Sequence, residues 1–570
     1  MSQKWIYKPE PDEDVVDGLS SSLGFGTFES KLLVLRGIDN YEKAREFFKP
    51  KLEDIHNPFL MADMQKAVER IATAIENGEK IMVYGDYDVD GTTAVALMYL
   101  YLSKIVEKKY LDFYIPDRNS EGYGISNEGI EYAKNEGFSL IIALDCGIKA
   151  IDKIDYAKEL GIDFIICDHH LPGEIIPDAV AVLDPKRSDC RYPFKELSGC
   201  GVGFKLCQGL NSIYKIPEAE LFELTDLLAI SIAADIVSMT GENRVLAKMG
   251  LKHLRKTRNL GLRMLIPEDK LAHFDISNIV FEIAPKINAA GRISHGKAAV
   301  ELMVSDNKMT AQKILADIMD LNDERRELDM NSTVSALNQI VVSGQENNFT
   351  TIVFDPEWNK GVIGIVASRL TETYYKPTLV FTEGTNGELV ASARSVADFD
   401  VHDALDRCSE YFEKFGGHRA AAGLSMKKDR FEEFKIKFEK VVAEVIQEHQ
   451  KVPSITIDSE MHIEDLNRDF INFHRKLAPF GPNNMKPILV LKKQKVSGYV
   501  KTMGKDNNHL KFYIKQESGR TLECVGFKLG HHADNFREKS FDIAFTVEEN
   551  HWKGNVTYYL NIRDVKFENE

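Results

Sequence analysis

The sequence predicts a multidomain α/β protein with a parallel-sheet domain, a long connecting helix, a second α/β domain and a small C-terminal β-barrel. Three observations support this fold class. Continuous apolar strands alternate with helical segments from about residue 80 to 185, which is typical of a parallel sheet covered on both faces. Residues 306–342 keep helical spacing throughout. After Val452-Pro453, short strands separated by polar turns replace the helices.

The bulk composition favours an ordinary globular protein. The chain has 570 residues, of which 44% are hydrophobic and 28% charged, so several domains with real cores are expected. It has no apolar run long enough to cross a membrane and no signal-peptide layout at its start. Seven cysteines without Cys-x-x-Cys spacing indicate reduced thiols and a cytoplasmic protein. The net charge of -16 argues against a general nucleic-acid binder but leaves a local basic groove open.

The first strand of the parallel sheet ends in a cluster of acids. Residues 80–84 read as a buried strand, and Asp86, Asp88 and Asp90 follow at alternate positions before a helix that we expect to open at Thr92. Carboxylates this close repel one another, and a divalent cation would resolve that repulsion. The alternative is an acidic turn solvated at the surface.

Acids and histidines also follow the later strands. Asp145 ends one strand, and Asp168-His169-His170 ends another. Ligands bind outside the carboxyl ends of the strands in an open parallel sheet, so these side chains should converge on one edge. Helix capping would explain one aspartate per junction, but not Asp-His-His. Asp235 follows a predicted helix over 219–234 and should pair either with Arg244 or with a metal, of which we favour the metal.

The second α/β domain carries residues suited to phosphate. Residues 361–364 open a helix whose free N–H groups could bind an anion. Arg394 lies two residues from the hydroxyl of Ser392, and Gly416-Gly417-His418 would let backbone approach a ligand closely. Taken singly, these are a surface arginine and turn glycines. Together with Arg292 and the acidic motif, they favour phosphate binding.

The C-terminal segment shows about five strands, the count of an OB-type barrel that binds single strands. Tyr499, Phe512 and Tyr513 could supply stacking rings. Five nearby lysines supply positive charge: Lys492, Lys493, Lys495, Lys501 and Lys505. The alternative is a structural β domain with ordinary surface lysines.

The ordered acidic and histidine motifs resemble the four motifs of the DHH phosphoesterase superfamily. Residues 285–292 resemble its arginine-bearing motif, and residues 361–369, 392–395 and 416–418 resemble the DHH-associated domain. The chain departs from the pattern at Tyr84 and Asn359, where many relatives carry histidine. The resemblance implies a helical preface over 1–60, a DHH catalytic domain over 61–300, a connecting helix over 301–345, a DHH-associated domain over 346–450 and an OB-like domain over 451–570.

The resemblance also implies roles for the site residues in a reaction that uses two Mn²⁺ or Mg²⁺ ions. Asp88 and Asp145 would hold one ion. The other would lie among Asp90, Asp145, His169 and Asp235, with Asp145 bridging and Asp86 as a further candidate ligand. Asp168 would support a histidine, and His170 would orient the phosphate. A 5′-phosphate end would be held by Arg118, Arg292, Ser392 and Arg394, with Gly416, Gly417 and His418 beside it.

The implied activity is 5′-to-3′ hydrolysis of single-stranded DNA to mononucleotides, in DNA repair and recombination. Single-stranded DNA would be the main partner, a single-strand-binding protein and a helicase are further candidates, and we expect a monomer away from membranes. One alternative is a DHH phosphodiesterase acting on dinucleotides or short oligoribonucleotides, which would need no C-terminal platform. The other is a non-catalytic single-strand-binding scaffold, which the intact aspartates disfavour.

Overall fold

The computed structural model describes residues 3–118, 120–384, 387–552 and 555–568. The chain forms two compact units. One combines Tyr7–Met319 with Ile457–Glu570 and is called the catalytic unit below. The other combines Met1–Ile6 with Asp320–Thr456 and is called the second unit. The helix α16 (Lys308–Val342) contains the boundary between Met319 and Asp320.

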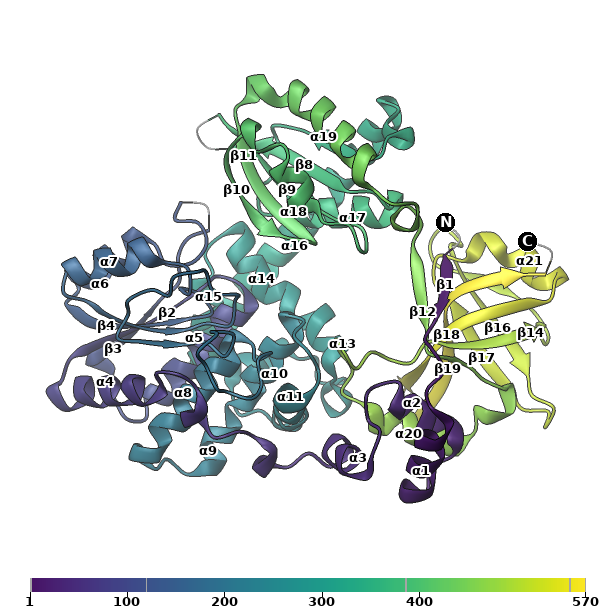
Figure 1. The fold of residues 1–570 in the computed structure, drawn as a ribbon, viewed down its shortest axis with the longest axis horizontal. Coiled ribbons are helices and arrows are strands. Elements are labelled where there is room, and N and C mark those ends of the chain that lie inside the picture. Colours follow the sequence, from purple (N-terminus) through teal and green to yellow (C-terminus); the bar gives the residue numbers. More distant parts are fainter. Residues whose placement is uncertain (1–2, 119, 385–386, 553–554, 569–570) are drawn as a thin grey trace. The chain divides into compact units, whose positions relative to one another are not determined.

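A five-stranded parallel sheet organises the catalytic unit, as the alternating pattern predicts (Figure 1). Ile81 and Val83 point to one face of β2 and Met82 and Tyr84 to the other, so both faces are apolar and buried. The strand order is β3 (Leu111–Tyr114), β2 (Lys80–Gly85), β4 (Phe138–Leu144), β5 (Asp163–Cys167), β6 (Ala181–Leu183). One face is covered by α4 (Met64–Asn77), α5 (Val89–Leu102) and α8 (Gly199–Tyr214), the other by α6 (Asn127–Asn135) and α7 (Ile151–Glu159).

Further helices extend the core around α5, and of these α10, α14 and α15 contact α5 itself. The segment expected as one helix over 219–234 is two, because the chain breaks at Leu224. These helices are α9 (Glu218–Glu223), α10 (Thr225–Ala234), α11 (Gly241–Leu254), α12 (Leu260–Leu265), α13 (Ile276–Asn278), a π-helical turn (Ile279–Ile283), α14 (Ala284–Ile293) and α15 (Lys297–Val304). Their apolar side chains join one core with those of α5 and α8, which places the C-terminal end of α10 beside the N-terminal end of α8.

The C-terminal part of the catalytic unit is a seven-stranded sheet, in agreement with an OB-type domain. Its order is β13 (Ser459–Glu460), β14 (Leu489–Gln494), β18 (Phe541–Trp552), β19 (Asn555–Phe567), β17 (Thr521–Gly526), β16 (His509–Lys515), β15 (Lys501–Met503). The helices α20 (Arg468–Leu477) and α21 (Ala533–Glu538) accompany it. N-terminal helices α1 (Glu13–Leu23), α2 (Thr27–Val34) and α3 (Tyr41–Phe48) share its core, where Leu32 and Leu33 join Phe470 and Phe473. In Figure 1, α1 and α2 lie beside α20.

The second unit is also α/β. Its sheet has the order β10 (Phe412–His418), β11 (Ala421–Met426), β9 (Leu389–Arg394), β8 (Thr378–Glu383), β7 (Thr351–Phe354). It carries α17 (Ile363–Tyr374), α18 (Val401–Asp406) and α19 (Phe431–Val445). A two-stranded pair joins β1 (Lys4–Tyr7) to β12 (Ser454–Ile457). Within the described ranges, no helix combines the length and apolar character that crossing a membrane requires.

Candidate metal centre and phosphate-binding residues

Acids from three strand ends and one helix end meet at the carboxyl edge of the parallel sheet. Asp86, Asp88 and Asp90 follow β2, Asp145 follows β4, Asp168 and the two histidines follow β5, and Asp235 ends α10. Asp88 is the N-cap of α5 and accepts from the Gly91 N–H at 2.9 Å, so the helix opens before Thr92 and our expected start there is wrong. An aspartate cap stabilises the helix and also fixes the direction of the acidic turn.

Two glycines allow the acids to approach closely. Asp145 has a positive φ of 59°, a conformation that aspartate tolerates better than most residues. A Cβ on Gly199 would lie 2.5 Å from the Asp145 side chain, and a Cβ on Gly91 would lie 2.4 Å from the Asp86 carbonyl oxygen. A larger residue at either position would displace the acids, so the glycines set the spacing of the cluster.

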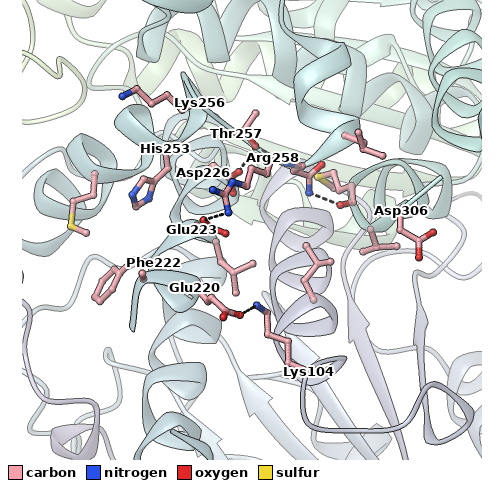
Figure 2. Close-up of a pocket in the computed structure, with 18 of the residues that line it drawn as sticks. Lys104, Glu220, Phe222, Glu223, Asp226, His253, Lys256, Thr257, Arg258 and Asp306 are labelled. Carbon is pink, nitrogen blue, oxygen red and sulfur yellow. Dashed lines mark hydrogen bonds and ion pairs between the residues drawn. The ribbon is translucent and has the colours of Figure 1, made fainter. Parts of the chain in front are cut away.

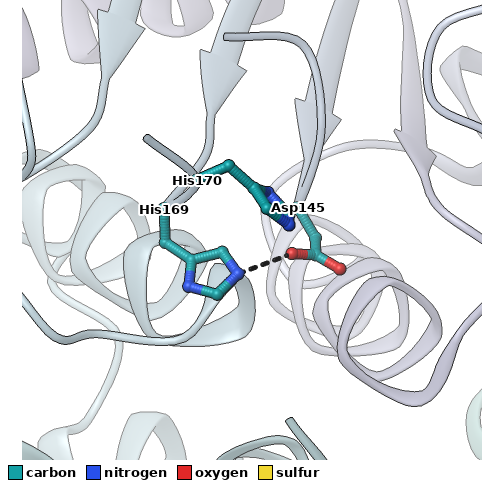
Figure 3. A group of neighbouring side chains, drawn as sticks. All are labelled: Asp145, His169 and His170. Atoms are coloured by element: carbon teal, nitrogen blue, oxygen red, sulfur yellow. Dashed lines mark ion pairs between the residues drawn. The ribbon is translucent and has the colours of Figure 1, made fainter. Parts of the chain in front are cut away.

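The His169 ring points toward the Asp145 carboxylate (Figure 3). Its Nε2 is 3.1 Å from Asp145 Oδ1, 3.6 Å from Asp235 Oδ2 and 3.8 Å from Asp90 Oδ2. One ligand atom from each of Asp90, His169 and Asp235 lies within 4.8 Å of the others, and the same holds for Asp145, His169 and His170. Residues separated by about 150 positions therefore form one centre, as the strand-end pattern predicts.

The cluster has buried polar atoms that no protein group satisfies. Asp86 Oδ2, Asp145 Oδ1 and both ring nitrogens of His169 are buried and make no hydrogen bond. Burial, and then the charge of Asp88, raises the pKa of Asp86 to about 8. Burial, and then Asp90, raises the pKa of Asp235 to about 8 and that of Asp145 well above its usual range. Oxygen and imidazole ligands with unmet charge fit a hard divalent cation such as Mn²⁺ or Mg²⁺.

Neighbouring groups hold two of the site residues in place. Asp90 accepts from the Gly199 and Cys200 N–H groups at 2.7 and 2.9 Å and from the Ser231 hydroxyl at 2.7 Å. Its carboxylate therefore lies at the positive N-terminal end of α8. Both carboxylate oxygens of Asp168 accept hydrogen bonds, Oδ2 from the Ile148 N–H and Oδ1 from the His169 N–H.

Asp168 also orients His170. The Asp168 Oδ1 atom lies 2.7 Å from His170 Nδ1. Burial acts to raise the pKa of Asp168, but the His170 hydrogen bond and charge lower it to about 2. Burial opposes protonation of His170, yet its bond to Asp168 raises its pKa above the ordinary value. The pair leaves His170 Nε2 directed toward the Tyr123 hydroxyl, 3.3 Å away.

Arg244 does not pair with Asp235. Its guanidinium is buried and donates to five carbonyl oxygens, those of Phe47 and of residues 476–479, at 3.0–3.4 Å. The local sequence offers no sign of this ring of carbonyls, and this ring removes the less favoured alternative, in which Arg244 pairs with Asp235. In the described chain, Asp235 has no lysine or arginine partner, in keeping with the metal alternative.

Tyr84 lies away from the cluster. It is fully buried on the face of the sheet that α6 and α7 cover. Its hydroxyl donates to the Gly124 carbonyl at 2.9 Å and accepts from the Ser126 N–H at 3.1 Å. It thus fixes the loop that leads into α6. In the second unit, Asn359 caps a turn by accepting from the Gly361 N–H at 2.7 Å.

Arg118 and Arg292 lie on the catalytic unit near the first acidic turn. The Arg118 guanidinium lies 5.1 Å from the centroid of the Tyr87 ring. Burial and then Asp86 raise the pKa of Tyr87 to about 12, while Arg118 and Arg292 both act to lower it. Two cations and an aromatic ring therefore border the acids, an arrangement suited to a phosphate and its base.

The remaining phosphate candidates lie together on the second unit. The Arg394 Nη1 atom donates to Ser392 Oγ at 2.8 Å, and a Cβ on Gly364 would lie 2.9 Å from Arg394 Nη2, so the first turn of α17 meets this pair. Strand register puts Gly416 and His418 on the same sheet face as Ser392 and Arg394. Gly417 lies between them in β10, with φ 152°. A Cβ at this position would lie 2.5 Å from the Ala421 carbonyl oxygen, so a larger residue does not fit.

One acid at this edge went unpredicted. Asp184 follows β6, the neighbour of β5; it is buried, and its Oδ2 has no hydrogen-bond partner. Burial first, and then Asp168, raise its pKa to about 7. The same strand-end rule that led to Asp145 and Asp168 would have found it.

One large cavity lies elsewhere in the catalytic unit. It measures about 920 Å³ and lies at the ends of α5 and α10 remote from the acids (Figure 2). Its lining includes the Lys104–Glu220 and Arg258–Glu223 ion pairs and the buried Asp226. None of the acidic or histidine residues of the cluster lines it.

Three segments of the chain match domain families of known proteins. Residues 80–232 match the DHH family N-terminal domain, residues 346–444 the DHHA1 domain and residues 457–564 the RecJ OB domain. The chain is 38% identical over 561 residues to the single-stranded-DNA-specific exonuclease RecJ of Bacillus subtilis, covering 97% of this chain and 70% of that protein. Its match to the Escherichia coli protein of the same name is 30% identical and covers 89% and 90% of the two chains.

Solved structures give the same result. The crystal structure of RecJ from Thermus thermophilus in complex with Mn²⁺ matches with a TM-score of 0.84 and 25% identity, covering 99% of this chain and 79% of that one. A structure titled exonuclease RecJ bound to manganese matches with a TM-score of 0.59 and 30% identity, covering 68% and 96%.

Proposed function

The chain belongs to the RecJ family, and from that premise we propose that it is a metal-dependent exonuclease that degrades single-stranded DNA from the 5′ end to mononucleotides. The observation that carries the proposal is the buried cluster around His169, in which Asp86 Oδ2, Asp145 Oδ1 and both His169 ring nitrogens make no hydrogen bond. A binding module would have no use for such a costly group of unpaired charges. Its relatives carry the name single-stranded-DNA-specific exonuclease.

We assign metal ligation to the cluster residues. Asp88 and Asp145 would hold one ion; Asp90, Asp145, His169 and Asp235 would hold the other, with Asp86 adjacent. When bound, such ions activate water and neutralise charge on the phosphate.

Polarity would come from capture of the 5′-phosphate. Arg118 and Arg292 border the acids on the catalytic unit, and Ser392 and Arg394 form a hydroxyl–guanidinium pair on the second unit, with Gly416, Gly417 and His418 nearby. Contacts of this kind fix position and orientation without reading the base.

The OB-type domain would hold the rest of the strand. Tyr499 is 66% exposed and could stack on a base, with Lys493, Lys495 and Lys505 supplying charge. Phe512 cannot serve as a platform, which corrects our expectation, because its ring is buried in the domain core. Lys492 is engaged with Glu460 at 2.5 Å.

We further propose the predicted domain boundaries, a monomer and a cytoplasmic location. All seven cysteines are buried and unpaired, which suits a reducing compartment. Strands opened by a helicase and covered by a single-strand-binding protein, during repair and recombination, are the proposed substrate.

A digestion assay tests the proposal. End-labelled single-stranded DNA, double-stranded DNA and RNA of several lengths are incubated with Mn²⁺ or Mg²⁺, with Asp145→Asn as the inactive control. We expect mononucleotides from long single-stranded DNA, faster from 5′-phosphorylated ends. Fastest turnover on dinucleotides with none on long strands would replace the proposal with the small-substrate alternative. Absence of metal-dependent hydrolysis would leave a binding scaffold.

A further inference from the structure

Ile236 occupies an unusual conformation directly beside the metal centre. It follows Asp235, whose Oδ2 lies 3.6 Å from His169 Nε2. Asp235 ends α10 in a right-handed conformation, and Ile236 then takes a positive φ of 56°. Its side chain is 65% exposed.

Isoleucine is a poor residue for this backbone position. A left-handed residue just past a helix end is normally glycine or asparagine, because a branched Cβ clashes with the following carbonyl. Ten non-glycine residues of the described chain have a positive φ, and Ile236 is the only β-branched residue among them. Five of the other nine are aspartate or asparagine.

Packing within the protein does not explain why isoleucine occupies position 236. The side chain is mostly open to solvent and belongs to none of the apolar cores in the described ranges, whereas the next residue, Val237, does pack against the main core. Strained residues collect at functional sites, where the side chain they present is used. A ligand bound at the acidic cluster is the group that the Ile236 side chain would contact.

We infer that Ile236 is a positioning residue whose exposed aliphatic side chain packs against the face of a nucleobase flanking the phosphate that is cleaved. The inference rests on the proposed exonuclease function. Ile236 directly follows Asp235 and is open to solvent, so it would lie near the sugar and base of a nucleotide whose phosphate is held at Asp235 and His169. Apolar contact with a base face is independent of base identity, so it suits an enzyme that accepts any sequence.

The test pairs removal of the side chain with removal of the base. Steady-state rates are measured for wild type, Ile236→Asn and Ile236→Leu on 5′-phosphorylated single strands with normal or abasic first and second nucleotides. We expect Ile236→Asn to raise KM about tenfold on normal DNA with a much smaller change in kcat, and Ile236→Leu to stay near wild type. On abasic DNA, Ile236→Asn should raise KM little further, because the contact between Ile236 and the base is already absent.

Lys215→Asn is the matched control. Lys215 is exposed and takes the same left-handed conformation, with φ 51°, after α8, but no site residue adjoins it. Both asparagine variants should keep or raise the melting temperature, by about 1–3 °C, because they relieve the same strain. Only the Ile236 variant should change KM.

Two results would overturn the inference. Effects of Ile236→Asn and base removal that simply multiply would show that the two groups do not touch. A clear fall in melting temperature for Ile236→Asn, with unchanged KM, would show that the side chain serves the fold. Failure of the wild type to digest single strands would instead refute the proposed function itself.

Discussion

Removing divalent cations should make the protein lose stability as the pH rises from 6 to 8. The cause lies in Asp86 and Asp235, whose pKa values are raised from 3.8 to about 8, by burial first and then by Asp88 and Asp90 respectively. In the unfolded chain both groups would already be ionised at pH 6. Over this window the folded state binds more protons than the unfolded state, so its stability falls with rising pH.

The size of the effect follows from the same values. Each group contributes about 1.4 kcal/mol per pH unit, so the two would contribute up to about 5 kcal/mol between pH 6 and 8. Because Asp88 raises the pKa of both groups, their titrations are not independent, and we expect about 3 kcal/mol. A bound cation removes the penalty by stabilising the ionised forms. The increase in melting temperature that Mn²⁺ produces should therefore be about 3 °C larger at pH 8 than at pH 6.

Differential scanning fluorimetry of EDTA-treated protein, with and without Mn²⁺ at pH 6, 7 and 8, measures this difference. Asp226→Asn is the control: Asp226 is buried with a pKa raised by burial to about 6, but it lies at the remote cavity. Its variant should keep the full response to Mn²⁺. An equal response at pH 6 and 8, or a full response in Asp145→Asn, would refute the placement of the cations among these acids.

Three further predictions concern single side chains. Asp145→Asn, which can keep the positive φ, should reduce hydrolysis at least about 100-fold while near- and far-UV circular dichroism stay unchanged; turnover near wild type would remove the bridging role. Arg394→Ala should raise KM for 5′-phosphorylated strands about tenfold. Arg407 is an exposed arginine paired with Asp403, so Arg407→Ala should leave KM unchanged. Equal effects of the two variants would count against 5′-phosphate capture by Arg394. Arg244→Met should lower the free energy of unfolding by about 3–5 kcal/mol in urea, and a loss under about 1 kcal/mol would mean that the five carbonyls find other partners.

The metal centre could be predicted because it depends on features that are local in sequence. A buried parallel strand is a short apolar run, and sheet polarity sends every strand end to the same edge. Asp145 and His169 were therefore placed together without knowledge of any contact. The same rule would have led to Asp184, had it been applied to the strand before it.

The start of α5 shows where local reasoning fails. Thr92 is a good capping residue, but Asp88 caps the helix instead and so begins it earlier. In a sequence, a capping aspartate and a metal-binding aspartate look the same. Asp88 shows the cap directly, since its Oδ1 accepts from the Gly91 N–H, whereas metal binding by the same residue is part of our proposal.

Arg244 marks the kind of contact that sequence patterns do not contain. Its guanidinium stacks 3.6 Å from the Phe47 ring centroid and donates to carbonyls more than 230 positions away. No period or spacing encodes a ring of backbone oxygens, since any residue type could supply them. As a result, the buried Arg244 side chain of α11 contacts both the N-terminal helix α3, at Phe47, and residues 476–479, which lead into the OB-type domain. α11, which carries Arg244, packs against α10, whose C-cap is Asp235, so two adjacent helices lie between the Arg244 contacts and the acidic cluster.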